Sequence, residues 1–178
     1  MANQYSDPKY ITTSVDLKNI ISRCQKCFNI TLNGSLIVPL NSLPTLTLPK
    51  TSQKKYFVIV HISNHRIGHW VAIAIYRNNS KAILIDPANE INNSQASLDC
   101  VQAFCELNKL QIVDFATRTQ SSHTNVCGQI VTAFLGKMSD FNYNSFLNLK
   151  QIMRSYSVEF NEHHLTSYTQ QHFNVSFN

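Results

Sequence analysis

The sequence predicts an α+β domain, with a central, mostly antiparallel sheet of about four or five strands flanked by helices. Three apolar, β-branched segments follow one another over residues 56–63, 69–77 and 81–86, separated by short polar stretches. Helical periodicity, with apolar residues at every third or fourth position, occurs on both sides of this run. Clustered strands with helices before and after them are typical of α+β proteins. A length of 178 residues predicts a single domain spanning residues 1–178.

The first expected element is a helix over residues 14–28. Thr13-Ser14-Val15-Asp16 matches a capping box, in which two polar side chains accept hydrogen bonds from each other's backbone N–H groups. Apolar residues then recur on one helical face, at Leu17, Ile20, Ile21, Cys24 and Phe28. Gly34 and three prolines interrupt the following stretch, so we expect a short strand and an irregular connection there.

The three apolar segments are predicted strands, and Asn78-Asn79-Ser80 between the last two is a predicted tight turn. The last two strands should therefore form a hairpin. If residues 77 and 78 face each other at the turn, residues 69 and 86 face each other at the open end. His69 and Asp86 are then predicted to be cross-strand neighbours.

The second half of the chain carries the remaining elements. Ser94 is expected to begin a helix with one apolar face, and residues 110–116 are expected to form a further strand. Another helix should start near Cys127 and direct its apolar residues inward. One or two more helices should follow from Asn144 onward.

Composition restricts the classes of function. The net charge is +5 and the basic residues are scattered, which indicates a solvated basic surface with at most weak attraction for DNA. No stretch approaches the roughly 20 apolar residues of a membrane span. The first ten residues lack the apolar core of a signal peptide, so we expect neither export nor membrane association. Five cysteines, an odd number, favour reduced thiols.

The glycine, histidine and cysteine patterns argue against several kinds of site. The four glycines form no phosphate-binding loop, no dinucleotide fingerprint and no turn around a serine nucleophile. His61, His65 and His69 are four residues apart, but they fall on strand ends and a turn, and no fourth zinc ligand can be named. Cys24 and Cys27 form a single CxxC pair, which is half of a zinc site. The sequence therefore predicts no bound metal.

A nucleophile with a base is the remaining constellation. His69 opens one hairpin strand and Asp86 ends the other, so the carboxylate can orient the imidazole. Cys127 stands at a helix start, after Asn125 as the expected cap, where the first-turn N–H groups favour a thiolate. Gln120 in the preceding loop can donate an amide N–H, and with the Cys127 backbone N–H it can form an oxyanion hole. Each residue alone has an ordinary structural explanation, but together they predict a cysteine hydrolase.

The order His, Asp, Gln, Cys narrows the class. Papain-like enzymes place the cysteine before the histidine, and caspases carry a different segment around the nucleophile. Trypsin-fold viral cysteine proteases share the order, but they have a glycine before the cysteine and strands on both sides of it. The motifs GHWVAIAIY, ILIDP and Q…CG resemble those of the adenovirus-type (adenain-like) maturation cysteine proteases and of the related ubiquitin-like-protein proteases. The resemblance covers residues 56–138.

The resemblance implies the cysteine-protease fold of the adenain and ubiquitin-like-protease type. It implies a triad of His69, Asp86 and Cys127, an oxyanion hole made by Gln120 and the Cys127 N–H, and Trp70 packed beside the site. Gln120 precedes Cys127 by seven positions, a spacing that is more similar to the adenoviral branch. Proteases of virophages and of large virus-like transposons are similar too.

The resemblance also implies a function. The substrates would be viral capsid or other virion precursor proteins, cleaved during maturation by a monomer. The protein would act in the virion or in the host-cell cytoplasm or nucleus. It would need no cofactor, with DNA or a peptide as an activator. Two alternatives stay open: an isopeptidase that removes a ubiquitin-like modifier, and a non-catalytic binding protein of the same fold.

Overall fold

The computed structural model describes residues 13–23, 37–50, 54–63, 68–114, 118–122 and 124–172. The helices in this part of the chain are α1 (Ser14–Arg23), α2 (Gln95–Leu107), α3 (Cys127–Asp140), α4 (Tyr143–Met153) and α5 (Val158–His172). The strands are β1 (Ile37–Pro39), β2 (Lys55–Ile62), β3 (His69–Tyr76), β4 (Lys81–Ile85) and β5 (Gln111–Asp114). Short 3₁₀ turns lie at η3 (Leu40–Thr45), η4 (Arg77–Asn79) and η5 (Ile91–Asn93).

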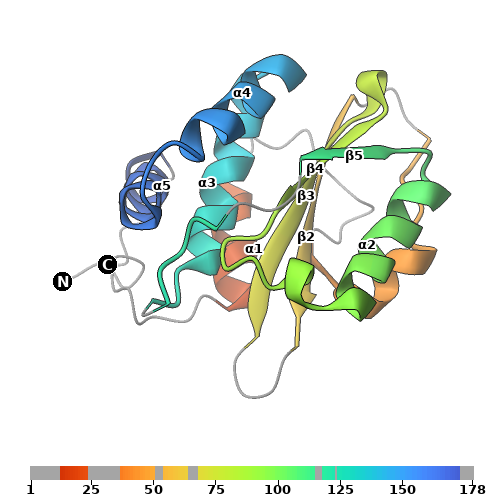
Figure 1. The fold of residues 1–178 in the computed structure, drawn as a ribbon, viewed down its shortest axis with the longest axis horizontal. Coiled ribbons are helices and arrows are strands. Elements are labelled where there is room, and N and C mark those ends of the chain that lie inside the picture. The colour runs from red at the N-terminus through yellow and green to blue at the C-terminus, as the bar shows by residue number, and fades with distance from the viewer. Residues whose placement is uncertain are drawn as a thin grey trace.

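The described strands form a five-stranded sheet in the order β1-β2-β3-β4-β5. The pairings of β2 with β3 and of β3 with β4 are antiparallel, whereas β1 is parallel to β2 and β5 is parallel to β4. The α+β prediction is confirmed, but the sheet is mixed, and only its three central strands are antiparallel. β5 is parallel to β4 because α2 carries the chain back along the sheet between them, as a crossover connection requires (Figure 1).

The register of the β3–β4 hairpin differs from the prediction by two residues. Ala72 pairs with Ile85, and the connection contains η4 followed by Ser80 in a left-handed conformation with φ of 52°. Because this connection is longer than the predicted turn, His69 and Asp86 are not directly opposite each other. A shift of two residues keeps them on the same face of the sheet, since side chains alternate with a period of two. They are therefore diagonal neighbours.

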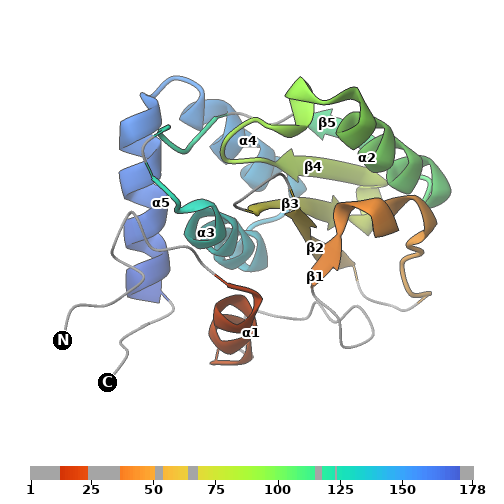
Figure 2. The same ribbon diagram turned by 90° about the horizontal axis from the view of Figure 1, so that it is seen from below.

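The two faces of the sheet are covered by different helices, with α2 on one side and α3 on the other (Figure 2). The β3 residues in the core on the α2 side include three that are β-branched: Val71, Ile73 and Ile75. Those on the α3 side include two alanines, Ala72 and Ala74. These small side chains let α3 pack close to the centre of the sheet.

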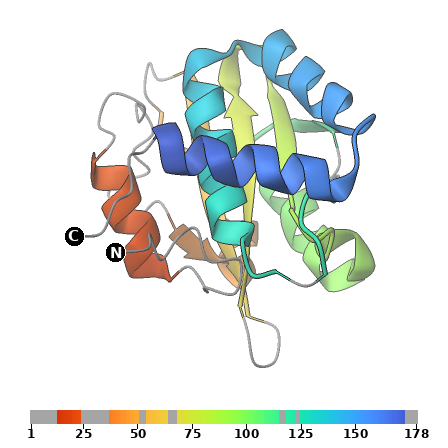
Figure 3. The same cartoon turned by 90° about the vertical axis from the view of Figure 1, so that its left-hand side faces the viewer.

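α3 lies between the sheet and α5, which crosses over it (Figure 3). Every residue from Cys127 to Met138 is buried, as expected for a helix covered on both sides. Lys55 of β2 closes the C-terminal end of α3, because its Nζ donates to the carbonyl oxygens of Met138 (3.1 Å) and Phe141 (2.9 Å). A cation at this end also complements the helix dipole. The sheet thus fixes the helix that carries Cys127.

The predicted helix starts are present. Thr13 N donates to Asp16 Oδ2 at 2.8 Å and Asp16 N donates to Thr13 Oγ1 at 3.2 Å, which is the predicted capping box. The Ser94 side chain accepts a hydrogen bond from the first turn of α2. The first predicted helix is described as far as Arg23, and its continuation to Phe28 lies outside the described residues. None of the described helices is both long enough and apolar enough to cross a membrane.

Candidate active site

The open ends of β3 and β4 bring an acid and an imidazole together. His69 is the first residue of β3, and Asp86 directly follows the last residue of β4. His69 Nε2 lies 2.8 Å from Asp86 Oδ1, and both side chains are buried. The predicted contact is present, between diagonal rather than directly opposite positions.

A turn after β4 orients the Asp86 carboxylate. The Asp86 carbonyl accepts a hydrogen bond from Asn89 N at 3.1 Å, and Asn89 has a φ of 58°, a left-handed conformation that asparagine tolerates. The chain then turns so that Ile91 N donates to Asp86 Oδ2 at 2.7 Å. Each carboxylate oxygen therefore has a partner, and the acid holds His69 by Nε2. The other ring nitrogen, Nδ1, is left for the thiol.

Cys127 is the first residue of α3, and its side chain lies close enough to the His69 imidazole to help raise the pKa of that ring. The expected cap, Asn125, is wrong: the N-cap residue is Val126, which makes no side-chain cap hydrogen bond. An apolar N-cap provides no acceptor for the first-turn N–H groups, which lack intrahelical partners. These groups favour negative charge at Cys127.

The electrostatics of the site favour a charged imidazole. Burial opposes the charged form of His69, but hydrogen bonds and charge interactions with Asp86 and Cys127 outweigh it. The pKa of His69 therefore rises from 6.5 to about 10. A protonated imidazole that is held by a carboxylate and lies beside a thiol is the arrangement used in nucleophilic catalysis by cysteine. This arrangement can activate a sulfur nucleophile.

Gln120 lies in the loop before α3 and is 7% exposed. The carbonyl of Pro87, the residue after Asp86, accepts hydrogen bonds from Thr119 N (2.8 Å) and Gln120 N (3.0 Å). The Gln120 side chain donates from Nε2 to the Thr124 carbonyl at 2.7 Å. A flipped amide would bring two oxygens together, so this contact defines the orientation of the side chain. The Gln120 side-chain NH₂ group carries two hydrogens: one is donated to the Thr124 carbonyl, and the second can be donated to a ligand.

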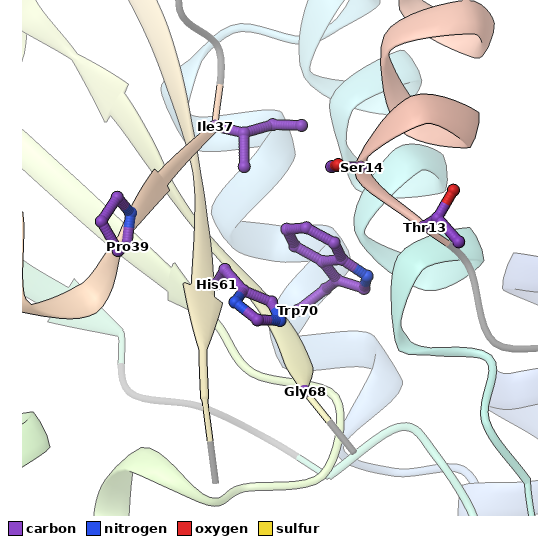
Figure 4. A pocket seen from close by; sticks show the side chains of 7 residues that line it. All are labelled: Thr13, Ser14, Ile37, Pro39, His61, Gly68 and Trp70. Atoms are coloured by element: carbon purple, nitrogen blue, oxygen red, sulfur yellow. The ribbon is translucent and has the colours of Figure 1, made fainter. Parts of the chain in front are cut away.

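A pocket of about 380 Å³ lies beside Trp70. The Trp70 indole belongs to the same buried apolar cluster as Cys127, and its ring centroid lies 4.7 Å from that of His61 on β2. Gly68 precedes His69, and a Cβ at this position would displace the His61 imidazole. Figure 4 shows the rest of the lining, which comes from β1 and the start of α1: Ile37, Pro39, Thr13 and Ser14.

Within the described residues, no three His, Cys, Asp or Glu side chains form a group that could hold a metal ion. His61 contacts Trp70, and His69 is paired with Asp86. The sequence also singled out His65, Cys24 and Cys27 as possible ligands, and these lie outside the described residues.

Sequence reasoning missed two contributors to the site. The Pro87 carbonyl links the acid to the Gln120 loop, and a sequence pattern gives no signal for a backbone acceptor. Glu162 of α5 accepts hydrogen bonds from Ser121 and Thr124 in the same loop. Glu162 lies far from Cys127 in the sequence, and only the packing of α5 on α3 reveals this contact.

No family model and no curated protein sequence matches this chain. Among solved structures, the central domain of the uncharacterized Lpg1148 protein from Legionella pneumophila is similar, with 14% sequence identity and a TM-score of 0.40. The alignment covers 86% of this chain and 94% of that one. The likeness is too distant to define a family.

Proposed function

We propose that this chain is an adenain-like cysteine endopeptidase that cleaves viral capsid or other virion precursor proteins. The observation that carries the proposal is the buried His69–Asp86 pair with Cys127 nearby at the start of α3. His69 is hydrogen-bonded to the acid, the nearby thiol helps to raise the pKa of the His69 imidazole, and the Gln120 loop is hydrogen-bonded to Pro87, next to the acid. The sequence motifs supply the family and the substrate class.

In the first half of the proposed reaction, the Cys127 sulfur attacks the scissile carbonyl carbon, and its proton resides on His69. The carbonyl oxygen becomes an oxyanion, which accepts hydrogen bonds from Gln120 Nε2 and the Cys127 backbone N–H. Asp86 keeps the imidazole oriented and stabilises its positive charge. The intermediate then collapses, the C–N bond breaks, and the leaving amine takes the proton from His69.

In the second half, His69 takes a proton from water, and the oxygen attacks the thioester carbon. The oxyanion forms again in the same place, so the same donors serve both steps. Collapse breaks the C–S bond, releases the carboxylic acid and returns the proton to the Cys127 sulfur. The pocket beside Trp70 is lined by Gly68 and Trp70, the residues on either side of His69, and in this proposal it takes a substrate side chain.

The test is cleavage of a proteome-derived tryptic peptide library whose N-termini are blocked before the full chain is added, with and without DNA. Mass spectrometry of newly formed N-termini reports each cut. The wild type should produce termini that share a sequence pattern, and Cys127→Ala should produce none. Cys105→Ala, which also removes a buried thiol, is the matched control and should cleave like the wild type.

Two outcomes contradict the proposal. Wild-type protein that produces no new termini under either condition is not an endopeptidase of peptides. Identical termini from Cys127→Ala would mean that another nucleophile, or a contaminant, makes the cuts. A fusion of a ubiquitin-like modifier to a reporter protein separates the isopeptidase alternative, which predicts cleavage of the fusion and no cleavage of the library.

A further inference from the structure

We propose that Glu162 is a positioning residue that holds the oxyanion donor Gln120 in place. Glu162 lies on the second turn of α5, outside the triad and outside every motif in the sequence. The inference rests on the proposed cysteine-protease function, because an oxyanion forms only in acyl transfer. It adds α5 to the elements that build the active site.

The Glu162 carboxylate accepts three hydrogen bonds from one short loop. Oε2 accepts from Ser121 N at 2.6 Å and from Thr124 Oγ1 at 2.7 Å, and Oε1 accepts from Ser121 Oγ at 3.4 Å. Hydrogen bonds to an ionised acceptor are shorter and stronger than those between neutral groups. Since residues 121 and 124 begin and end the loop segment, the carboxylate fixes both ends of it to α5.

The fixed loop in turn fixes the Gln120 amide. The Thr124 carbonyl accepts the hydrogen bond from Gln120 Nε2 at 2.7 Å. Thr124 therefore binds Glu162 through its hydroxyl and Gln120 through its carbonyl. On the other side, Pro87 holds the Gln120 backbone N–H at 3.0 Å. Gln120 is thus held between the end of β4 and α5.

The part of α5 that carries Glu162 is itself anchored. Asn161 is buried and donates from Nδ2 to the Met153 carbonyl of α4 at 2.7 Å. Two turns further on, Thr169 Oγ1 donates to the Gln129 carbonyl of α3 at 2.6 Å. Gln129 is two residues after Cys127, so α5 is bonded to the first turn of the nucleophile helix. The hydrogen bonds of α5 to α3 and α4 therefore fix the position of Glu162 relative to Cys127.

The placement of an oxyanion donor affects kcat by an amount that can be estimated. Removing an oxyanion donor costs about 10²–10³ in kcat, and a misplacement of about 1 Å costs about 10²-fold. Glu162→Ala leaves Gln120 present but releases the loop that orients it. It should therefore lower kcat by about 10–10²-fold, with little change in KM, because the donor acts mainly on the transition state.

A double-mutant cycle tests the proposal, with Glu162→Ala, Gln120→Ala and the double variant assayed on a peptide taken from the cleaved library. If Glu162 acts through Gln120, Glu162→Ala adds almost nothing once Gln120 is gone. Glu162→Gln keeps one acceptor oxygen and should restore part of kcat. Glu159→Ala, at an exposed acid on the same helix, is the matched control and should leave kcat unchanged.

Hydrogen–deuterium exchange at the Ser121 amide gives a second readout that does not depend on activity. Glu162→Ala should accelerate this exchange, and Glu159→Ala should not. If the wild type cleaves no peptide, the proposed function fails, and this exchange still reports whether Glu162 holds the loop. Unchanged exchange, unchanged kcat in folded Glu162→Ala, or an equal loss of kcat with and without Gln120 would overturn the inference. If Glu162→Ala does not fold, the same exchange and kcat measurements are made on Glu162→Gln, alone and combined with Gln120→Ala.

Discussion

Two buried cysteines, Cys127 on α3 and Cys105 on α2, differ in their position along the helix and in the polar groups near the thiol. Cys127 is 7% exposed and Cys105 is 3% exposed. Cys105 lies near the C-terminal end of α2, in the apolar core on that side of the sheet. Burial, together with the nearby Glu106 carboxylate, raises the pKa of Cys105 from 9.0 to about 11. Cys127 begins α3, and its side chain helps to raise the pKa of the His69 imidazole.

The difference shows that position within a helix and a polar neighbour determine the chemistry of a buried thiol. A thiolate near a helix C-terminus would meet the negative end of the helix dipole, whereas one at the N-terminus meets the positive end. The imidazole beside Cys127 can also carry the displaced proton. Substitutions of the thiol, the acid and the oxyanion donor, and a rise in pH that deprotonates the imidazole, therefore test the difference between Cys127 and Cys105.

Replacing each thiol gives the largest expected contrast. Cys127→Ala should abolish peptide cleavage, a loss of about 10⁶-fold, because it removes the nucleophile. Cys105→Ala should leave kcat close to the wild-type value and lower the free energy of unfolding by roughly 1 kcal/mol, because it leaves a small cavity in the core. Cleavage rates and thermal denaturation measure both effects. Near-wild-type turnover by Cys127→Ala would contradict its role.

Replacing the acid should give the next largest effect. Asp86→Asn can still accept the hydrogen bond from Ile91 N, but it cannot stabilise the imidazolium, so kcat should fall by about 10⁴-fold and remain measurable. By comparison, His69→Ala should lose nearly all activity, because it removes the base itself. Asp99→Asn, at an exposed carboxylate on α2, is the control. If Asp86→Asn turned over as fast as this control, the acid would be misassigned.

Replacing the oxyanion donor should give a smaller loss. Gln120→Ala should lower kcat by about 10²–10³-fold and leave KM nearly unchanged, since the donor acts on charge that exists only in the transition state. Gln120→Glu should be worse, because a carboxylate repels both the oxyanion and the thiolate. Gln102→Ala, at an exposed position on α2, should have no effect. If steady-state kinetics show a wild-type kcat in both Gln120 variants, Gln120 is not an oxyanion donor.

The pH dependence of stability tests the His69–Asp86 pair without an activity assay. The pKa of His69 is about 10 in the folded state against 6.5 as a free side chain, so between these values the folded protein binds more protons than the unfolded one. The stabilisation is complete below pH 6.5 and is lost as the pH rises toward 10. Tm should therefore fall from pH 7 to 10, and less steeply in Asp86→Asn. Equal slopes in a series of calorimetric scans would count against the His69–Asp86 coupling.

The sequence predicts the local elements well because their signals are local. Periodicity and the capping residues Thr13, Asp16 and Ser94 identify the helix starts. The strand segments are recognised from their apolar, β-branched composition. The hairpin register was wrong by two residues because the length of the connection depends on Ser80 adopting a left-handed conformation. The parallel pairing of β5 was missed although a strand–helix–strand order allows it.

The candidate site was predictable only in part, for a related reason. Two of its members, His69 and Asp86, belong to one hairpin, so strand geometry brings them together. The proximity of Cys127 to His69 depends on how α3 packs on the sheet. The motif resemblance implied this proximity, but helical periodicity did not. Asn125 was expected as a cap, and the structure has Val126 instead. The role of Glu162 depends on tertiary packing alone.

The activation of Cys127 can be measured by alkylation with iodoacetamide at pH 6, followed by mass spectrometry of the individual cysteine peptides. Cys100 is more exposed than Cys127, so accessibility alone predicts that Cys100 reacts first. Only the thiolate is reactive, so if Cys127 is an activated nucleophile it should react faster than Cys100, with Cys105 slowest. His69→Ala should then make Cys127 slower than Cys100. Faster labelling of Cys100 in the wild type, or labelling of Cys127 that does not respond to His69→Ala, would contradict the claim that Cys127 is an activated nucleophile.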